Sequence, residues 1–313
     1  MTRSAVLSLL ALFLSALGVL LALNACGTGN LRIPSGKIHH VVVIVPENRS
    51  PDNLFHDPVL ISRGADIASS GMSSSGTRVP LQPVPLGVDY DLSHTHQAFV
   101  TMYDHGRMDG GDKIPIVCTT TCPPLNAAFR YVGPSDVAPY FQMAEQYTFG
   151  DRMFQTNEGP SFPAHQFLIS GTSAPTETSH WFAAENTNDL FLGGCNAPPQ
   201  TLTLLIDPNG RESVATYPCF EHRTLTDEMD AVGLPWRYYA PSASHIWTAP
   251  NAIRHMCQPE IQNGQPVCTG KAWKNVIIPP KLFLTDIGRN QLAAVTWGRA
   301  YRSGIRSPGL SPH

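Results

Sequence analysis

The chain has 313 residues, of which 42% are apolar and only 14% are charged, and its formal net charge at pH 7 is −3. This length allows one large domain or two ordinary ones with a sizeable core, and 25 glycines and 28 prolines are too few for a low-complexity, collagen-like or disordered protein. Because the charge is slightly negative and no basic block is present, we expect no binding to nucleic acid.

Residues 1–26 have the pattern of an export signal. A single cation, Arg3, precedes an almost wholly apolar run over residues 5–23. The sequence Leu-Asn-Ala-Cys, which ends at Cys26, resembles a bacterial lipobox, in which the cysteine becomes lipidated. Since the run is longer than an ordinary signal core, a retained membrane anchor at the N-terminus is an alternative. We therefore predict a signal peptide or a lipoprotein signal or anchor, then a linker over residues 27–37. The protein is expected to be exported: periplasmic, extracellular or lipid-anchored to the cell envelope.

The rest of the chain alternates between strand and helix patterns. An unbroken β-branched run over residues 41–45 predicts a strand buried on both faces, as in a parallel sheet. Residues 63–88 are rich in Ser, Gly and Pro and predict an exposed loop. Beyond them we predict, in order, a helix over 137–146 with Pro139 in its first turn, a helix over 161–170 closed by Gly171, a helix over 224–232 stopped by Gly233, a strand over 236–239, and a helix and a strand (293–297) within 280–297. This alternation favours the α/β class.

The cysteines beyond the first segment agree with export. They are even in number, which predicts disulfides in an oxidising compartment: Cys118, Cys122, Cys195, Cys219, Cys257 and Cys268. Pairing each cysteine with its neighbour in sequence is the simplest arrangement, because each such pair brackets a polar loop that contains proline. A zinc site built on the first two cysteines is the alternative, although it lacks a matching second pair.

The first candidate site follows the predicted buried strand. Glu47 and Asn48 stand side by side there, and ligands of open α/β sheets sit beyond the carboxyl ends of the strands. A carboxylate and a carboxamide offer hard oxygen ligands to a divalent cation. The alternative is a turn with an asparagine cap, in which Arg49 either holds a phosphate or pairs with Asp52.

The second candidate is Ser161, which follows a Gly-Pro break at the start of a predicted helix. The free N–H groups and the positive dipole end of a helix N-terminus attract phosphate, and a hydroxyl there can attack phosphorus once its pKa is lowered. An ordinary serine N-cap is the alternative.

His94 and His96 form the third candidate. A His-x-His pair can ligate a metal or protonate a leaving group, but two histidines in a polar stretch are also common surface residues.

The candidate sites, with the segments around them, resemble the conserved blocks of one known family. Four ordered blocks are similar to those of the bacterial phosphoesterase family, which includes phospholipases C and acid phosphatases. The blocks are residues 38–50, residues 91–94 with 106–110, residues 150–154 with 159–165 and 169–172, and residues 225–230 with 233–239.

The resemblance implies an alkaline-phosphatase-like α/β fold, a mostly parallel sheet with helices on both faces. It also implies a divalent metal ion held by Glu47, Asn48 and Ser161, with Asn48 contacting phosphoryl oxygens. Ser161 would be the nucleophile, and His94 would assist the leaving group, with His96 as the weaker substrate contact. The substrate would be a phospholipid or a small phosphomonoester, and a serine nucleophile leans towards the acid phosphatases, where phospholipases C often carry threonine.

The resemblance ends near residue 297, so we predict a phosphoesterase domain over 38–297 and a tail over 298–313 that is unlike the family. Family members continue through a later acidic pair and further histidines that complete the metal site. We therefore expect a fold that is incomplete at its C-terminal end and an activity that this truncation impairs. The alternative is a non-catalytic remnant that binds a phosphate ester or a partner at the cell surface.

Overall fold

The computed structural model describes residues 36, 38–88, 90–118, 125–189 and 191–299. The predicted signal, most of the predicted linker and nearly all of the predicted tail therefore lie outside the described residues. Contacts divide the chain into one unit over Met1–His39 and a second over His40–His313. Every helix and strand named below belongs to the second unit.

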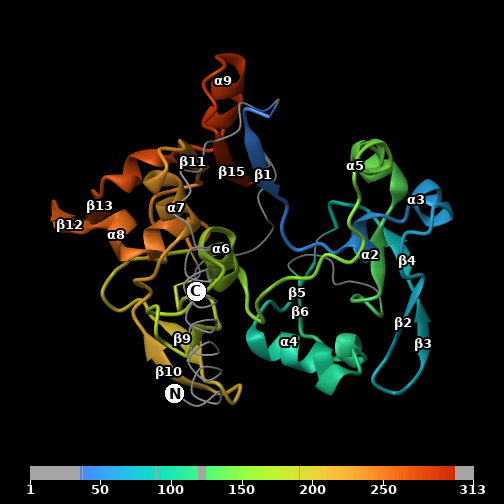
Figure 1. Cartoon of the computed structure of the whole chain (residues 1–313). Coiled ribbons are helices and arrows are strands. Elements are labelled where there is room, and N and C mark those ends of the chain that lie inside the picture. The colour runs from blue at the N-terminus through green and yellow to red at the C-terminus, as the bar shows by residue number, and fades with distance from the viewer. Residues whose placement is uncertain (1–35, 37, 89, 119–124, 190, 300–313) are drawn as a thin grey trace, which may run out of the picture. The chain divides into compact units, whose positions relative to one another are not determined.

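The sheet at the centre of the second unit is parallel. It is formed by β1 (Val41–Val45), β15 (Val295–Arg299), β11 (Trp236–Tyr239) and β14 (Val276–Ile277), in that spatial order. Each neighbouring pair of strands runs in the same direction, with Val41 opposite Val295 and Val295 opposite Trp236. Parallel neighbours need crossover connections, and helices occur in the segments between these strands (Figure 1). The predicted α/β class is confirmed.

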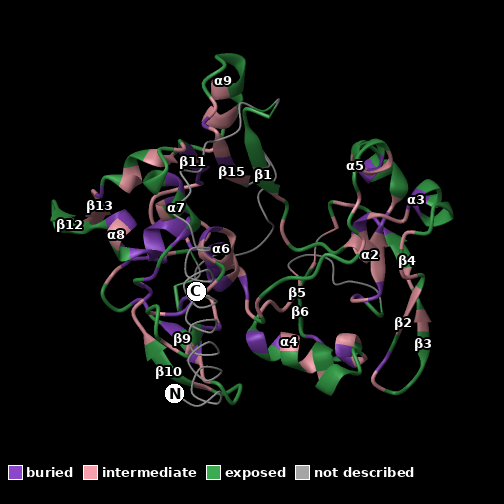
Figure 2. Ribbon diagram, viewed as in Figure 1, coloured by how far each residue is buried: buried purple, intermediate pink, exposed green. Residues whose placement is uncertain are grey.

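The burial predicted for the first strand is wrong. β1 is an edge strand that pairs only with β15 within the described residues, and Val41, Val42 and Ile44 are 50%, 38% and 55% exposed (Figure 2). The β-branched run gives the strand its conformation. Burial of its two faces depends on neighbouring elements, and a local sequence pattern does not specify these.

The helices agree in part with those predicted. They are α2 (Pro51–Leu54), α3 (Pro58–Ser62), α4 (His96–Tyr103), α5 (Pro134–Gln146), α6 (Ser161–Ser170), α7 (Leu225–Ala231), α8 (Arg254–Cys257) and α9 (Leu282–Gly288), with 3₁₀ turns η1 (Asp104–Gly106), η2 (Gly110–Lys113), η3 (Ala249–Ala252) and η4 (Ala272–Asn275). The bounds of α6 are as predicted, and Gly171 ends it with a φ of 65°, a left-handed conformation that suits glycine. Thr224 caps α7 in a capping box with Asp227.

One helix begins earlier than predicted. α5 starts at Pro134, which fits the first helical position because its missing N–H would be unpaired there anyway. Pro139 is therefore inside the helix and not in its first turn. The apolar spacing from residue 137 onward was visible in the sequence, but the polar first turn carried no such signal.

The remaining strands are short and lie in small sheets. They are β2 (Ser70–Met72), β3 (Arg78–Pro80), β4 (Gln82–Val84), β5 (Asp91–Leu92), β6 (Ile116–Val117), β7 (Arg130–Val132), β8 (Phe182–Ala183), β9 (Thr203–Ile206), β10 (Glu212–Thr216), β12 (Pro259–Gln262) and β13 (Gln265–Cys268). Residues 63–88, predicted as a loop, contain a β2–β3 hairpin and β4, which pairs with β7. β2 and β3 pair with each other across a short turn, and β4 is a strand because it pairs with β7 further along the chain.

Helix α6 contributes to two apolar clusters. Ile169, near its C-terminal end, packs in a cluster with Trp236 and Trp297 of the central sheet. Phe162, near its N-terminal end, packs in a second cluster with Leu205. Both α6 side chains are 1% exposed. Burial at both ends holds the helix firmly, and Ser161 is its first residue.

Two of the three predicted disulfides are confirmed. Cys195 bonds to Cys219 and Cys257 bonds to Cys268. The third predicted pair includes Cys122, which lies outside the described residues. A search of the described part of the chain finds no helix of the length and apolarity that crossing a bilayer requires.

Candidate active site

The end of strand β1 places the first candidate pair. The side chain of Glu47 is only 11% exposed, and its Oε1 contacts Nε2 of His165 on α6. Asn48 follows with a φ of 68°, a left-handed conformation that asparagine tolerates better than most residues, and it is exposed. The chain then enters α2, which Ser50 caps, so the alternative of an asparagine cap is wrong. Arg49 donates to Asn53 and does not pair with Asp52, which accepts from the Ala68 N–H.

Ser161 is the first residue of α6 and not its cap. The N-cap is Pro160, which has no side-chain oxygen to offer, so the alternative of a serine cap is wrong. No described residue hydrogen-bonds to Ser161 Oγ, and the hydroxyl remains available. Gly159 is required just before it, because a Cβ there would lie 2.4 Å from the carbonyl oxygen of Ala184.

The first turn of α6 offers fewer N–H groups than the sequence suggested. Phe162 N–H donates to Asn186 Oδ1 at 2.8 Å, Pro163 has no N–H, and Ala164 N–H donates to Pro160 O at 3.1 Å. Of the described N–H groups in this turn, only that of Ser161 is left for an anion. The anion site predicted at this helix N-terminus is therefore a single donor next to the hydroxyl.

His165 lies on the helix that Ser161 begins, and it contacts Glu47. It lies four residues after Ser161 on the same helix, a spacing that places two side chains on one face with Cβ atoms ~6 Å apart. Its Nε2 faces Glu47, and its Nδ1 lies 3.2 Å from the hydroxyl of Tyr238, which itself donates to Trp247 O at 2.9 Å.

His165 is the last residue of the range 159–165 in the third block, and the sequence alone assigns it no role. The signal that could have found it is the spacing of four residues from Ser161 on a predicted helix. Its partner Glu47 lies 118 residues away and carries no local signal.

His94 is held by a carboxylate. Its Nε2 lies 3.0 Å from Asp91 Oδ1. The hydrogen bond with Asp91 raises the pKa of His94, the charges of Asp91 and Glu47 add to the rise, and burial opposes it. A raised pKa favours the protonated imidazole, which is the form that protonates a leaving group.

His96 lies in a different environment from His94. It is 4% exposed, and its Nδ1 lies 2.9 Å from Glu158 O, three residues before Ser161. Its backbone N–H donates to Glu185 Oε1 at 2.6 Å. These contacts favour a role in fixing the loop before Ser161 and do not favour contact with a substrate.

Glu185 itself has a perturbed pKa. Burial raises the pKa of this carboxyl to about 7, and the negative charge of Glu212 adds to the rise. The N–H and the charge of His96 oppose it.

The side chains of Glu47, Asn48 and Ser161 carry oxygen atoms, the type of ligand that a hard divalent cation prefers. All three supply oxygen, and an ion such as Mg²⁺ is commonly held by one or two carboxylates with substrate phosphate and water completing its shell. Within the described ranges, no three His, Cys, Asp or Glu side chains form a group that could hold a metal ion. Each of Glu47, Asn48 and Ser161 supplies an oxygen donor of the type that a divalent ion binds together with phosphate oxygens.

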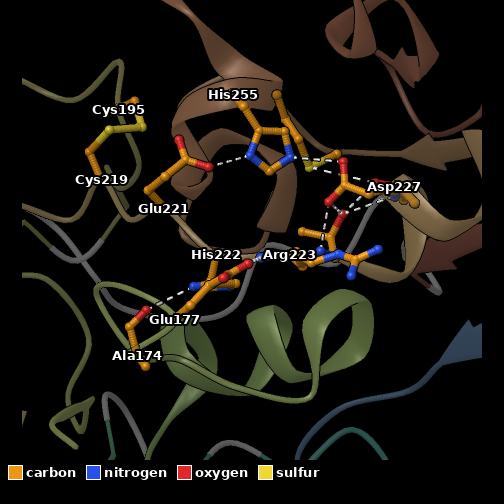
Figure 3. Close-up of polar contacts among 12 residues, drawn as sticks. Ala174, Glu177, Cys195, Cys219, Glu221, His222, Arg223, Asp227 and His255 are labelled. Carbon is orange, nitrogen blue, oxygen red and sulfur yellow. Dashed lines mark hydrogen bonds and ion pairs between the residues drawn. A yellow bond between two sulfur atoms is a disulfide. The ribbon is translucent and has the colours of Figure 1, made fainter. Parts of the chain in front are cut away.

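A second histidine cluster lies elsewhere on the chain (Figure 3). His255 contacts Glu221 Oε1 through Nδ1 at 2.5 Å and Asp227 Oδ1 through Nε2 at 3.1 Å. The neighbouring His222 is buried, its Nδ1 lies 2.8 Å from Ala174 O, and burial lowers its pKa. Sequence reasoning found no role for these histidines. The cluster shares no residue with the group around Ser161.

The model of the Phosphoesterase family matches residues 38–301, a range that contains both the group around Ser161 and the cluster around His255. A search of curated proteins finds no match.

Proposed function

Because the chain belongs to the Phosphoesterase family and is a phosphoric ester hydrolase by that resemblance, we propose that it hydrolyses phosphate mono- or diesters by attack of the Ser161 hydroxyl on phosphorus. The observation that carries this proposal is the position of Ser161. It is the first residue of a buried helix, its hydroxyl is available, and His165 on the same face contacts Glu47.

Each residue of the group has a chemical role in this proposal. Ser161 Oγ forms the new bond to phosphorus as the bond from phosphorus to the alcohol oxygen breaks, and the proton of the serine hydroxyl passes to solvent water. The N–H of the same residue donates to a phosphoryl oxygen, where charge develops. His94, whose pKa is raised by Asp91, gives its proton to the departing alcohol oxygen. Water then hydrolyses the phosphoserine. His165 keeps Glu47 in place through the contact between its Nε2 and Glu47 Oε1.

We assign the metal role to the same oxygens. Glu47, Asn48 and Ser161 would hold a divalent ion, which would lower the pKa of the serine hydroxyl and offset the charge of the phosphoryl group. The identity of the ion is open, because these oxygens suit several hard cations.

We assign the protein to the acid phosphatase type and to the exported proteins. The serine at position 161 supports the first assignment, since the related phospholipases C often carry threonine. Two disulfides and the export pattern of residues 1–26 support the second, because disulfides persist in oxidising compartments. The proposed domain covers residues 38–297.

The test is hydrolysis of p-nitrophenyl phosphate and of phosphatidylcholine by the full chain and by S161A. We expect S161A to lower kcat about a thousandfold or more, because loss of a nucleophile removes the covalent route. Acid quenching and mass spectrometry should find phosphate on Ser161 in the parent only. S170A is a matched control on the same helix, since Ser170 bonds only to backbone carbonyls at the other end of α6. Equal activity of S161A and the parent would reject the nucleophile, and binding of phosphate ester without turnover would favour the non-catalytic alternative.

A further inference from the structure

The start of α6 lacks a capping side chain of its own. Its N-cap is Pro160, and the first N–H that a capping residue normally satisfies belongs to Phe162. A buried N–H without a partner costs about 1–3 kcal/mol. Here the partner comes from 24 residues further along the chain, where Asn186 Oδ1 accepts the Phe162 N–H at 2.8 Å.

The segment that carries Asn186 is tied to the sheet of β8, β9 and β10. Ala184 N–H donates to Leu204 O at 2.9 Å, and Thr203 Oγ1 donates to Glu185 O at 2.7 Å. Asn186 therefore connects the first turn of α6 to an ordered support.

The same segment supports the His94 side of the group. Glu185 Oε1 accepts the His96 N–H at the start of α4, and His96 Nδ1 bonds to Glu158 O in the loop that leads to Ser161. Adjacent residues of one segment thus hold the first turns of the two helices next to His94 and Ser161.

We propose that Asn186 is a positioning residue for the hydrolysis, an inference that rests on the function proposed above. Asn186 fixes the first turn of α6 so that the hydroxyl and the N–H of Ser161 keep one orientation toward the phosphoryl group. It also occupies the Phe162 N–H, which leaves Ser161 as the single backbone donor of that turn. Orientation matters for the rate, because a misplacement of about 1 Å can cost about a hundredfold.

The experiment compares three substitutions with the parent in the full chain. Asn186→Leu keeps the size of the side chain and removes the acceptor, Asn186→Asp keeps an acceptor, and Asn186→Gln moves the amide by one methylene. Asn188→Leu is the matched control, because Asn188 lies two residues away and accepts from Leu202 N–H, with no contact to α6. The readouts are kcat and KM for p-nitrophenyl phosphate and the urea midpoint of unfolding.

We expect N186L and N186Q to lower kcat by about ten- to a hundredfold with KM changed by less than about threefold. N186D should keep kcat within about threefold of the parent, although its added charge raises KM for an anionic substrate. N188L should also keep its kcat. The inference is overturned if N186L and N186Q keep the parent kcat, if N186D is as slow as N186L, or if N188L is as slow as N186L.

The Ser161→Ala variant separates this inference from the proposed function. If S161A is as active as the parent, the proposed nucleophile is wrong. If S161A is inactive while N186L and N186Q are fully active, only the role of Asn186 is wrong. N186Q and N186D retain polar side chains, so the comparison stands even if N186L does not fold.

Discussion

Two histidine–carboxylate clusters in this chain differ in burial and in what lies beside them. In the cluster of Glu47 and His165 the side chains are 11% and 5% exposed, and Ser161 lies one helical turn away. In the cluster of Glu221, His255 and Asp227 they are 47%, 32% and 32% exposed. No candidate nucleophile of the sequence analysis belongs to the second cluster. Similar side chains therefore have different roles, because their surroundings differ.

Burial decides how strongly each contact acts. A buried polar group that loses its partner costs about 1–3 kcal/mol, since it is left without water and without a hydrogen bond. An exposed ion pair is worth about 0–1 kcal/mol, because solvent screens it. The contact with His165 can therefore hold the Glu47 carboxylate in one position against α6. The contacts of Glu221 and Asp227 with His255 stabilise the positions of those carboxylates much less.

The largest effect is expected from Glu47→Ala. This change leaves the buried imidazole of His165 without its carboxylate partner, so the free energy of unfolding should fall by about 1–3 kcal/mol, and hydrolysis should be lost. Urea unfolding and the p-nitrophenyl phosphate assay measure the two effects. The double variant E47A/H165L should recover much of the stability and none of the activity, because it removes both polar partners. A single variant that loses less than 1 kcal/mol would show that the two clusters do not differ in strength.

A smaller effect, on stability alone, is expected from the disulfide next to the second cluster. Cys257 lies two residues after His255 and bonds to Cys268. Closing this short loop should stabilise the fold by about 2–3 kcal/mol, so C257S/C268S should lower the free energy of unfolding by that amount. We expect kcat to stay the same well below the melting temperature. A matching fall in kcat would connect the second cluster to catalysis and contradict the distinction drawn here.

The next effect is on the pH dependence of unfolding, and it concerns Glu185, which is not part of the cluster around His255. The pKa of Glu185 is raised to about 7 from an ordinary value near 4.5, so the folded state favours its protonated form. Its contribution to stability is full below about pH 4.5 and is lost as pH rises through about 7. We expect Glu185→Gln to remove part of the fall in unfolding free energy between pH 4.5 and pH 8. His94, whose pKa is also raised, adds a fall of the same sign that the substitution leaves in place. An identical pH profile for E185Q and the parent would contradict the raised pKa.

Much of the fold followed from patterns within short stretches of sequence. The β-branched run predicted β1, and the Gly-Pro break with Gly171 predicted the bounds of α6, because propensity and capping act between near neighbours. The exposure of β1 and the strand β4 were not predicted, since they depend on which distant segments pair. The local β2–β3 hairpin was missed because its stretch is rich in Ser, Gly and Pro.

The candidate site was also predicted only in part, namely where a short stretch of sequence carries a signal. Glu47, His94 and Ser161 stand in ordered blocks that resemble a family, so they could be named from the sequence. His165 could not be assigned, because its partner is 118 residues away, and Asn186 belongs to none of the blocks. Contacts between distant residues appear only once the chain is folded.

The smallest effect is expected from Glu221→Gln, a substitution in the second cluster. The amide oxygen can still accept from His255 Nδ1, and only a partly exposed charge is lost. We expect the free energy of unfolding to fall by less than about 1 kcal/mol. The difference between E221Q and the parent should shrink further at high salt, because screening weakens an exposed pair. Urea unfolding at low and high ionic strength measures this, and kcat should equal that of the parent. A loss above about 2 kcal/mol, or any fall in kcat comparable to that of E47A, would mean that His255 and its carboxylates act as strongly as the buried pair beside Ser161.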